Sequence, residues 1–528
     1  MKETILNKLQ DNPIVQQMLQ FGNNIGNLLP NEEALCLASA FMQDKQTRIV
    51  VKKNRYEAQQ LYQRLKPLIN DTLLFVMEES LRVQAIASSP EDKQEQLYVL
   101  TQLVKEDKPR IIICNTAAFF RYLPDKELFR NLCFKFEVDQ ETTMTELKQK
   151  LNRAGYTKVN YVDRPCTYAS RGGIVDVYCL EYDHPIRIEF FDTVIESIRI
   201  FHEETQRTIE TIDSVLINPA TDLLFTDDQI EFLQKEIDSE LEKQHEKLIQ
   251  DDYDFLLDYI EKDKIALENY DIDPHLYIYF SYLKANQFMD YVQGHIIFSS
   301  QEEVENGYKK LNEETISFIQ EMVESHQYLP KYGMFHDVFA FEKEHNIQMF
   351  HDFMDFKNPI FSKIETLEKS DQPLIKVLEN LKGKTIYISL DEEHTKKVEE
   401  ALKAYSIHKN IIFIEDDFYE GFVYEDISVY TQQELFHRPS QIKRYQKTFK
   451  QGQILQNILE LEPNDYVVHE QYGIGQYVGI TTRKIKGKTL DYLHVIYNGG
   501  DELYVPLSQF QLVRKYVSKE GVGINYLN

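Results

Sequence analysis

Residues 171–192, RGGIVDVYCLEYDHPIRIEFFD, read as two β-strands joined by a polar turn. Two sets of residues alternate along the second strand: Ile186, Ile188 and Phe190 in one set, and Arg187, Glu189 and Phe191 in the other. Because side chains on a strand point to opposite faces in turn, each set shares one face. If the isoleucine face lies on the core, an arginine and a large aromatic side chain lie together on the outer face. The stretch therefore predicts a β-rich module with an outer face that needs a functional explanation.

The bulk composition limits the classes of function. The chain has 528 residues, which predicts about three to five domains. Its formal net charge of −27 and its isoelectric point of about 5.0 argue against general binding to nucleic acid or anionic membranes. The 5 cysteines form no CxxC pair, which argues against zinc modules and a disulfide framework and for a reducing cytosol. The N-terminal segment has no signal-peptide core and no run reaches the ~18 apolar residues of a membrane span, so we expect a cytoplasmic protein without membrane contact.

The order of strand and helix patterns predicts several α/β units. In residues 1–125, apolar runs such as RIIICN (110–115) alternate with helical patterns, which predicts a parallel sheet. Residues 126–217 hold one helix, 144–155, which ends at a glycine suited to a helix C-cap, and after it only strands. This change predicts a small domain inserted into the α/β domain. Residues 218–345 add acidic helices and a buried-strand candidate, GHIIFSS, and residues 346–436 return to α/β.

The composition changes again near the C-terminus. Residues 437–451 have many bases and almost no acids, so the segment is either a solvated connector or a linker with weak affinity for phosphate groups. A short helix at 453–461 follows. Residues 462–528 show at least four short alternating strands punctuated by glycine, with NGGDE as a hairpin turn. They predict a small SH3-like barrel.

Motifs that would mark an enzyme are missing. The sequence contains no GxxxxGK[ST] phosphate loop, no GxSxG, no HExxH and no GxGxxG linked to a strand. Its 14 histidines are scattered and its carboxylates are too numerous to single out a pair. On residues alone, the chain is a binding protein without a catalytic or metal site.

Four segments carry a family resemblance. RGGIVDVY, PIRIEFFDTVIESIRIF and TQRTIE resemble the small inserted domain of UvrB and of the transcription-repair coupling factors. DYVVHEQYGIGQYVGI and the strands after it resemble the RNA-polymerase-interacting domain of the coupling factors, which is related to CarD. YEGFVYEDISVYTQQELF (419–436) resembles the end of the family's third domain, and SSPEDKQEQLYVL (88–100) resembles its first domain. The chain is therefore identified as similar to the N-terminal, non-motor portion of this family.

The resemblance implies a multidomain α/β fold. It comprises a UvrB-like degenerate RecA-type α/β domain with an inserted α+β domain, a small α/β third domain and a C-terminal SH3-like (CarD- or Tudor-like) β-barrel. The expected limits are 1–125 and 218–345 for the UvrB-like domain, 126–217 for the inserted UvrA-binding domain, 346–436 for the third domain, 437–461 for the basic linker and helix, and 462–528 for the polymerase-interacting domain.

The resemblance also implies a degenerate nucleotide site. In NLLPNEEAL (27–35), Pro30 replaces a glycine of the phosphate loop and Glu33 falls about where the catalytic lysine would be. A phosphate needs backbone N–H donors and a cation, and a carboxylate repels it. Ser300 and Gln301 replace the acid pair that would bind Mg²⁺. We therefore expect no cofactor and no enzyme activity on this chain, because the family's ATP- and Mg²⁺-dependent DNA translocase motor, through which it mainly contacts double-stranded DNA, lies beyond the polymerase-interacting domain.

The family's inserted domain binds UvrA, the damage-recognition protein. The motif match carries this role to Arg171, Arg187 and Phe191. Arg187 and Phe191 are four residues apart and share a strand face at a separation of about 13 Å. Arginine and aromatic residues are enriched at interface hot spots. The alternative is that Phe191 belongs to the core of a two-sided strand and that Arg187 pairs with Glu189 or another neighbour.

The family's terminal barrel binds the β subunit of RNA polymerase through strand edges near TTRKIKG (481–487). The corresponding contacts here are Thr482, Arg483, Lys484 and Ile485. Edge strands offer unpaired N–H and C=O groups for such contacts. Arg483 departs from the family, where this position often holds an apolar residue, and agrees with CarD-like proteins, which often carry arginine there. The alternative is that all four are ordinary solvent-facing strand residues.

The resemblance implies a bacterial cytoplasmic protein of transcription-coupled nucleotide-excision repair. We expect a monomer that connects stalled RNA polymerase at its C-terminal barrel to UvrA at its inserted domain. One rival is a UvrB-like ATPase or helicase. The other is a CarD-like regulator of RNA polymerase without a role in repair.

Overall fold

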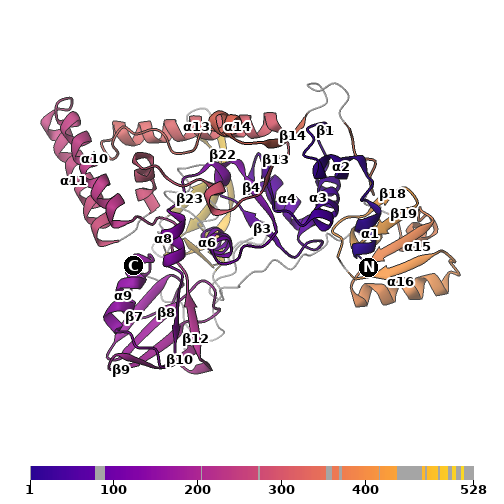
Figure 1. Ribbon diagram of the computed structural model, residues 1–528, viewed down its shortest axis with the longest axis horizontal. Coiled ribbons are helices and arrows are strands. Elements are labelled where there is room, and N and C mark those ends of the chain that lie inside the picture. The colour runs from indigo at the N-terminus through magenta and orange to yellow at the C-terminus, as the bar shows by residue number, and fades with distance from the viewer. Residues whose placement is uncertain are drawn as a thin grey trace. The chain divides into compact units, whose positions relative to one another are not determined.

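Short, largely buried and mainly apolar strands build the sheet at the centre of the larger part of the structure (Figure 1). The sheet has six strands in the order β1-β14-β13-β2-β4-β3, and all the pairs are parallel. Its strands are β1 (Ile25–Gly26), β2 (Arg48–Lys52), β3 (Thr72–Phe75), β4 (Ile111–Asn115), β13 (His295–Phe298) and β14 (Ile347–His351). Parallel sheets are covered on both faces, which is why these strands are continuous apolar runs. The predicted parallel sheet is confirmed, and strands from after the insertion complete it.

The structure is a computed structural model. It describes residues 2–77, 90–203, 205–270, 274–351, 360–367, 372–415, 417–436, 466–469, 473–485, 488–496, 502–506 and 513–515. The chain divides into two units, Met1–Ile442 and Lys443–Asn528, and each is described by itself. The basic linker and helix predicted at 437–461 lie outside the described residues.

Helices cover the parallel sheet on its two faces (Figure 1). On one face, α3 (Pro30–Asp44) and α4 (Arg55–Leu65) pack in one core cluster with Val50 and Ile113 of the sheet. On the other, α6 (Pro90–Lys105), α7 (Thr116–Phe120) and α13 (Gln301–Glu324) pack with Ile112 and Phe298. Ile112 and Ile113 are neighbours on one strand but belong to different core clusters, so the sheet separates two cores.

The third domain is a mixed five-stranded sheet in the order β15-β18-β19-β16-β17. Its elements are β15 (Glu365–Thr366), α15 (Leu374–Glu379), β16 (Thr385–Ser389), α16 (Glu392–Ala404), β17 (Ile411–Ile414), β18 (Phe422–Tyr424), β19 (Ile427–Tyr430) and α17 (Gln432–Phe436). One of its faces shares a core cluster with α3 and with the N-terminal helices α1 (Lys2–Lys8) and α2 (Pro13–Leu19). The Nε of Arg64 on α4 lies 2.9 Å from a carboxylate oxygen of Glu420, which adds an ion pair to this contact.

The acidic helices are α10 (Asp227–His245) and α11 (Gln250–Asn269). Each buries one stripe, represented by Ile237 on α10 and Ile260 on α11, and leaves most of its charges on the other side. Asp263 of α11 is an exception, because it is buried and accepts a hydrogen bond from the Tyr279 hydroxyl over 2.7 Å. The remaining elements of this part are α8 (Lys126–Asn131), the 3₁₀ helix η1 (Pro274–Tyr282), α12 (Phe288–Tyr291) and α14 (Val338–Glu344). The prediction of a single helix in 126–217 is wrong, because Asp125 caps the additional helix α8 at the start of this range. In the described ranges, no helix is long and apolar enough to cross a membrane.

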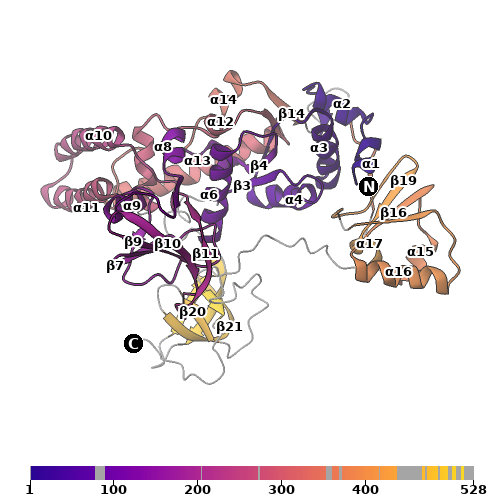
Figure 2. The same ribbon diagram turned by 60° about the horizontal axis from the view of Figure 1, so that its bottom comes forward.

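The inserted domain is one helix against an antiparallel-rich sheet (Figure 2). Its elements are β5 (Phe134–Glu137), α9 (Met144–Arg153), β6 (Thr157–Lys158), β7 (Thr167–Arg171), β8 (Ile174–Tyr178), β9 (Ile186–Phe191), β10 (Val194–Phe201), β11 (Thr208–Ile212) and β12 (Ser214–Ile217). The sheet order is β11-β10-β9-β8-β7-β6, and β5 pairs separately with β12. The predicted glycine C-cap is confirmed, because Gly155 follows α9 with a φ of +81°, in the left-handed region that glycine adopts without strain.

The alternation along β9 is observed in the fold. Ile186 and Ile188 are buried and join the core cluster that also contains Leu147 and Leu151 of α9. Phe190 is half-buried against the same cluster, so the third apolar position is only partly covered. Phe191 lies on the other face with 74% of its surface exposed. The isoleucine face is therefore the core face.

The second unit is a five-stranded antiparallel sheet in the order β23-β22-β21-β20-β24. Its strands are β20 (Tyr466–His469), β21 (Gly473–Ile485), β22 (Lys488–Ile496), β23 (Glu502–Pro506) and β24 (Val513–Lys515). Val467, Leu493 and Val505 are buried in it. The expectation of at least four strands is confirmed, and the turn predicted at NGGDE falls mostly outside the described residues. Closure of this sheet into an SH3-like barrel stays a prediction.

The two faces of β9 predict opposite effects of truncation on stability. Ile188→Ala removes a fully buried side chain and leaves a cavity, so we expect the free energy of unfolding to fall by about 2–5 kcal/mol. Phe191→Ala removes an exposed side chain and should leave it nearly unchanged. Urea unfolding followed by circular dichroism measures both. Similar losses for the two variants would contradict the assignment of the faces.

Candidate docking faces and the degenerate nucleotide site

Strand pairing brings Arg171 and Arg187, the two arginines predicted from the sequence, to one face of the inserted domain. This side of the sheet is called the arginine face. β7 ends at Arg171 and turns through Gly172, whose φ of +56° favours glycine. β8 then runs antiparallel to β9, which places Asp176 opposite Arg187. An added Cβ on Gly173 would lie 3.0 Å from the carbonyl oxygen of Phe190, so the two strands are close at this point. The two glycines thus serve backbone geometry.

Arg187 is held on the face by a bidentate ion pair. Its Nε and Nη2 donate to the two carboxylate oxygens of Asp176 over 2.7 and 2.8 Å. Nη2 also donates to Oε1 of Gln206 over 2.7 Å, and the guanidinium lies over the ring of Phe201, 4.3 Å from its centroid. The hydrogen bonds to Asp176 raise the pKa of Arg187, which therefore stays charged. Only 15% of its side chain is exposed.

The alternative stated for Arg187 and Phe191 is confirmed for Arg187 and wrong for Phe191. Arg187 does pair with a neighbour, but the neighbour is Asp176 and not Glu189. Glu189 instead pairs with Arg199 and accepts a hydrogen bond from Ser197 Oγ over 2.9 Å. Phe191 is not part of the core.

Arg171 is the more accessible of the two predicted arginines. Its side chain is 55% exposed, and its Nη2 lies 3.4 Å from Asp176 Oδ2 and 3.3 Å from Gln206 Oε1. Arg171 is among the contacts predicted from the sequence, whereas Asp176 and Gln206 are not. A signal for Asp176 was present, because an acid between two apolar residues of a strand lies on the face opposite to theirs, which here is the arginine face.

At the predicted degenerate nucleotide site, an internal ion pair is found. Helix α3 starts at Pro30, which has no N–H, and the Glu32 carboxylate accepts the N–H of Leu29 over 2.9 Å. Glu33 is only 1% exposed, and its carboxylate lies 2.7 Å from Lys52 Nζ at the end of β2. Ser299, after β13, donates its hydroxyl to Glu33 Oε1 over 2.5 Å. The lysine that could face a phosphate is thus paired with the protein's own carboxylate.

The two residues at the expected acid positions serve α13. Ser300 is its N-cap and accepts the N–H of Glu303 over 3.4 Å, and Gln301 donates to Glu305 Oε1 over 2.9 Å. Neither supplies a carboxylate. In the described part of the chain, no group of three or more histidine, cysteine, aspartate or glutamate residues could hold a metal ion.

The predicted polymerase contacts lie on the long strand β21. Its first residues, Gly473–Gln476, pair with β20 on one side. Thr482, Arg483, Lys484 and Ile485 pair with β22 on the other, and within the described residues β22 is their single neighbouring strand. The backbone of this part of β21 thus has one unpaired edge in the described structure, which suits strand addition.

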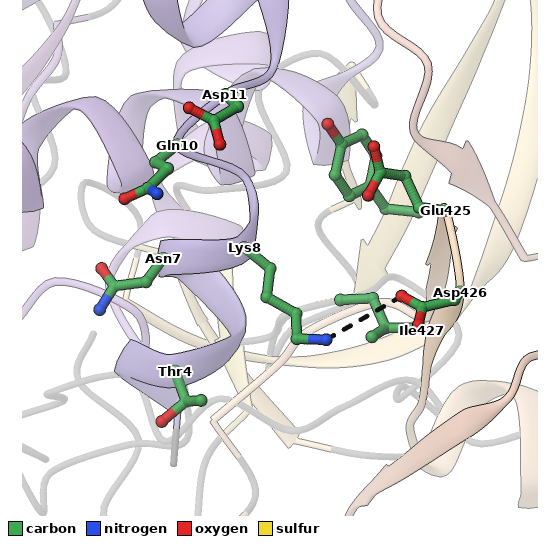
Figure 3. Close-up of a pocket in the computed structure, with 9 residues that line it drawn as sticks. Thr4, Asn7, Lys8, Gln10, Asp11, Glu425, Asp426 and Ile427 are labelled. Carbon is green, nitrogen blue, oxygen red and sulfur yellow. Dashed lines mark ion pairs between the residues drawn. The ribbon is translucent and has the colours of Figure 1, made fainter.

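One cavity of about 290 Å³ lies between α1 and the turn from β18 to β19 (Figure 3). It is lined by polar side chains that include Lys8, Asp11, Glu425 and Asp426, and Lys8 Nζ is 3.9 Å from Asp426 Oδ1. None of the residues predicted from the sequence to have a functional role lines it. Three carboxylates and one amine in an open crevice define no ligand class.

Comparison with family models identifies two domains. The model described as UvrB interaction domain matches residues 134–223, and the model described as CarD-like/TRCF RID domain matches residues 461–517. The first range contains β5 to β12, including the arginine face, and the second contains β20 to β24. The limits predicted from the sequence for the other domains stay predictions.

Known relatives match along most of the chain. The transcription-repair-coupling factor of Bacillus subtilis (strain 168) is 28% identical over 527 residues, which cover 89% of this chain and 43% of that protein. The Staphylococcus epidermidis protein of the same name is 26% identical, with 98% of this chain and 48% of that protein covered. The Staphylococcus haemolyticus protein is 26% identical, with 94% and 45% covered. The chain thus spans less than half the length of these relatives, and the resemblance expected from the sequence is confirmed.

The buried pair at the degenerate site predicts a large effect of removing one partner. Glu33→Ala leaves the amine of Lys52 buried without its carboxylate, so we expect the free energy of unfolding to fall by about 3–5 kcal/mol. The double variant Glu33→Leu, Lys52→Met should recover much of this loss. Glu231→Ala, which breaks the exposed pair with Lys235, is the control and should leave stability unchanged. A Glu33→Ala chain as stable as the unaltered chain would refute the pairing.

Proposed function

We propose that this chain, related along most of its length to the transcription-repair-coupling factors, takes part in transcription-coupled nucleotide-excision repair. It would connect stalled RNA polymerase, bound by the C-terminal unit, to UvrA, bound by the inserted domain. The observation that carries the proposal is the presence of a UvrB interaction domain and a CarD-like/TRCF RID domain in one chain, in this order.

The inserted domain supports the UvrA part of the proposal. Phe191 exposes a large aromatic surface at the end of β9, and Arg171 exposes a cation on the same face. Exposed aromatic and arginine side chains are the types that dominate protein interfaces. Both side chains are positioned by strands of one sheet, and a rigid support of this kind lowers the entropy lost on docking.

The second unit supports the polymerase part. The register of β21 leaves the backbone at 482–485 with an open edge in the described structure, and strand addition there would give main-chain hydrogen bonds to the β subunit. Such bonds do not depend on side-chain identity, so the proposed contact tolerates Arg483, where the family often has an apolar residue.

The proposal assigns no nucleotide chemistry to the UvrB-like domain. Lys52 is neutralised by Glu33, and Ser300 and Gln301 are used in the first turn of α13. A polyphosphate would have to displace an internal ion pair and would meet a carboxylate in place of a cation. The UvrB-like ATPase is therefore the weaker of the candidate functions.

Binding to purified UvrA tests the docking face. We expect Phe191→Ala to weaken UvrA binding by tenfold or more, because truncation of an aromatic hot spot costs about 2 kcal/mol or more. Ile209→Ala is the matched control, since Ile209 is also an exposed apolar residue of this sheet, on the edge strand β11, and should have little effect. Titration followed by surface plasmon resonance measures both affinities.

The same titrations separate the proposal from the CarD-like alternative. An unaltered chain that binds the polymerase β subunit but not UvrA would favour a polymerase regulator without a role in repair. Equal UvrA affinities of the Phe191→Ala and Ile209→Ala chains would reject the face.

Calorimetry with nucleotide tests the absence of ATP chemistry. Titration of ATP with Mg²⁺ into the chain should give no saturable heat, because the internal pair occupies the place of a phosphate-binding lysine. Saturable binding that is lost in a Lys52→Ala chain would revive the UvrB-like ATPase.

A further inference from the structure

The arginine face carries one positive charge more than its internal carboxylate neutralises. Asp176 is buried, and both of its oxygens accept hydrogen bonds from Arg187 at 2.7 and 2.8 Å. Arg171 reaches the same carboxylate at 3.4 Å, a longer contact with an oxygen that is already engaged. Two guanidinium groups thus share one carboxylate, and the one left less paired is the one more exposed.

Gln206 holds both arginines without adding a charge. It lies in the turn between β10 and β11, and its Oε1 accepts from Arg187 over 2.7 Å and lies 3.3 Å from Arg171 Nη2. Its Nε2 donates to the hydroxyl of Tyr161 and to the carbonyl of Glu203, each over 2.8 Å. All the hydrogen bonds of the amide group are therefore accounted for. A glutamate of the same length in this position would neutralise the excess charge.

We propose that this face takes one carboxylate of its partner on Arg171, and that Gln206 determines this specificity by offering the arginines a neutral oxygen. Arg187 is then a positioning residue, because Asp176 already occupies it and its side chain is largely covered. The inference rests on the proposed docking of UvrA and names the chemistry of that contact.

The rest of the face limits what the partner presents beside its carboxylate. Arg171 is opposite Ile174, and Ile174 is opposite Glu189, so Arg171 and Phe191 are separated by two strand spacings across the sheet and two residues along it, on the order of 12 Å. Phe191 is exposed. On this face of β9, Glu189 is paired with Arg199 and hydrogen-bonded to Ser197, so this part of the face has no excess charge. The face therefore fits an acidic side chain and an apolar side chain that are separated on the partner's surface by a distance of this order.

Gln206→Glu is the test, and Gln149→Glu is its matched control. We expect Gln206→Glu to weaken the binding of UvrA by tenfold or more, because the new carboxylate pairs with Arg171 and competes with the partner's. Gln149→Glu makes the same substitution at an exposed position of α9, which packs on the isoleucine face of the sheet, opposite to the arginines, and should change the affinity less than twofold.

A second measurement on the full chain does not depend on UvrA. Phenylglyoxal modifies accessible guanidinium groups, and mass spectrometry reports the rate at each arginine. We expect Arg171 to react several-fold faster than Arg187 in the unaltered chain, and Gln206→Glu to slow Arg171 several-fold while Gln149→Glu does not.

The two measurements distinguish a failure of this inference from a failure of the proposed function. Equal reactivity of Arg171 and Arg187, or no protection of Arg171 by Gln206→Glu, overturns the inference whether or not UvrA binds. Unchanged UvrA affinity of the Gln206→Glu chain overturns it as well. An unaltered chain that shows the expected reactivities but does not bind UvrA overturns the proposed function, and supports the assignment of the free charge to Arg171.

Discussion

The carboxylate of Asp176 organises the outer face of the inserted domain. A buried carboxylate costs several kcal/mol of desolvation unless charged donors surround it, and here Arg187 supplies two hydrogen bonds from one planar group. The geometry of that pair orients Arg187 over Phe201 and gives Gln206 its place in the turn to β11. The face thus depends on a contact that joins β8, β9 and the turn after β10, which fixes these side chains before any partner arrives.

The part of the chain with the parallel sheet also contains a buried ion pair, but there the charges balance. At the carboxyl ends of its parallel strands, where α/β proteins commonly bind ligands, Glu33 and Lys52 satisfy each other and Ser299 completes the contact. On the arginine face of the inserted domain, one carboxylate meets two arginines, which leaves one positive charge without a carboxylate. At the nucleotide site, the charges balance. The arginine face and the Glu33–Lys52 site therefore differ by one unit of net charge.

Much of the inserted domain and of the parallel sheet could be predicted from the sequence, because the sequence patterns that specify them are local. The period of two along β9 gives the buried face from Ile186 and Ile188, and the apolar runs give the parallel sheet. The glycine after α9 marks the end of the helix. Phe190 departs from the pattern because it lies near the end of the strand, where the core cluster covers it only in part.

Contacts that depend on register or on distant segments could not be predicted. Asp176 meets Arg187 across the pairing of β8 with β9, and Gln206 reaches both arginines from a turn 19 residues after Arg187 along the chain. The core that α1 and α2 share with the third domain joins the two ends of the first unit. Periodic patterns in the sequence do not predict contacts of this kind.

The exposed ring of Phe191 and the accessible charge of Arg171 have different thermodynamic consequences. Burial of the ring by a partner removes apolar surface from water and gives a negative heat-capacity change. Pairing of Arg171 with a partner carboxylate contributes attraction that salt screens, and it acts on the rate of association. The temperature dependence of complex formation therefore reports the contact at Phe191 on β9, and its ionic-strength dependence reports the contact at Arg171 on β7.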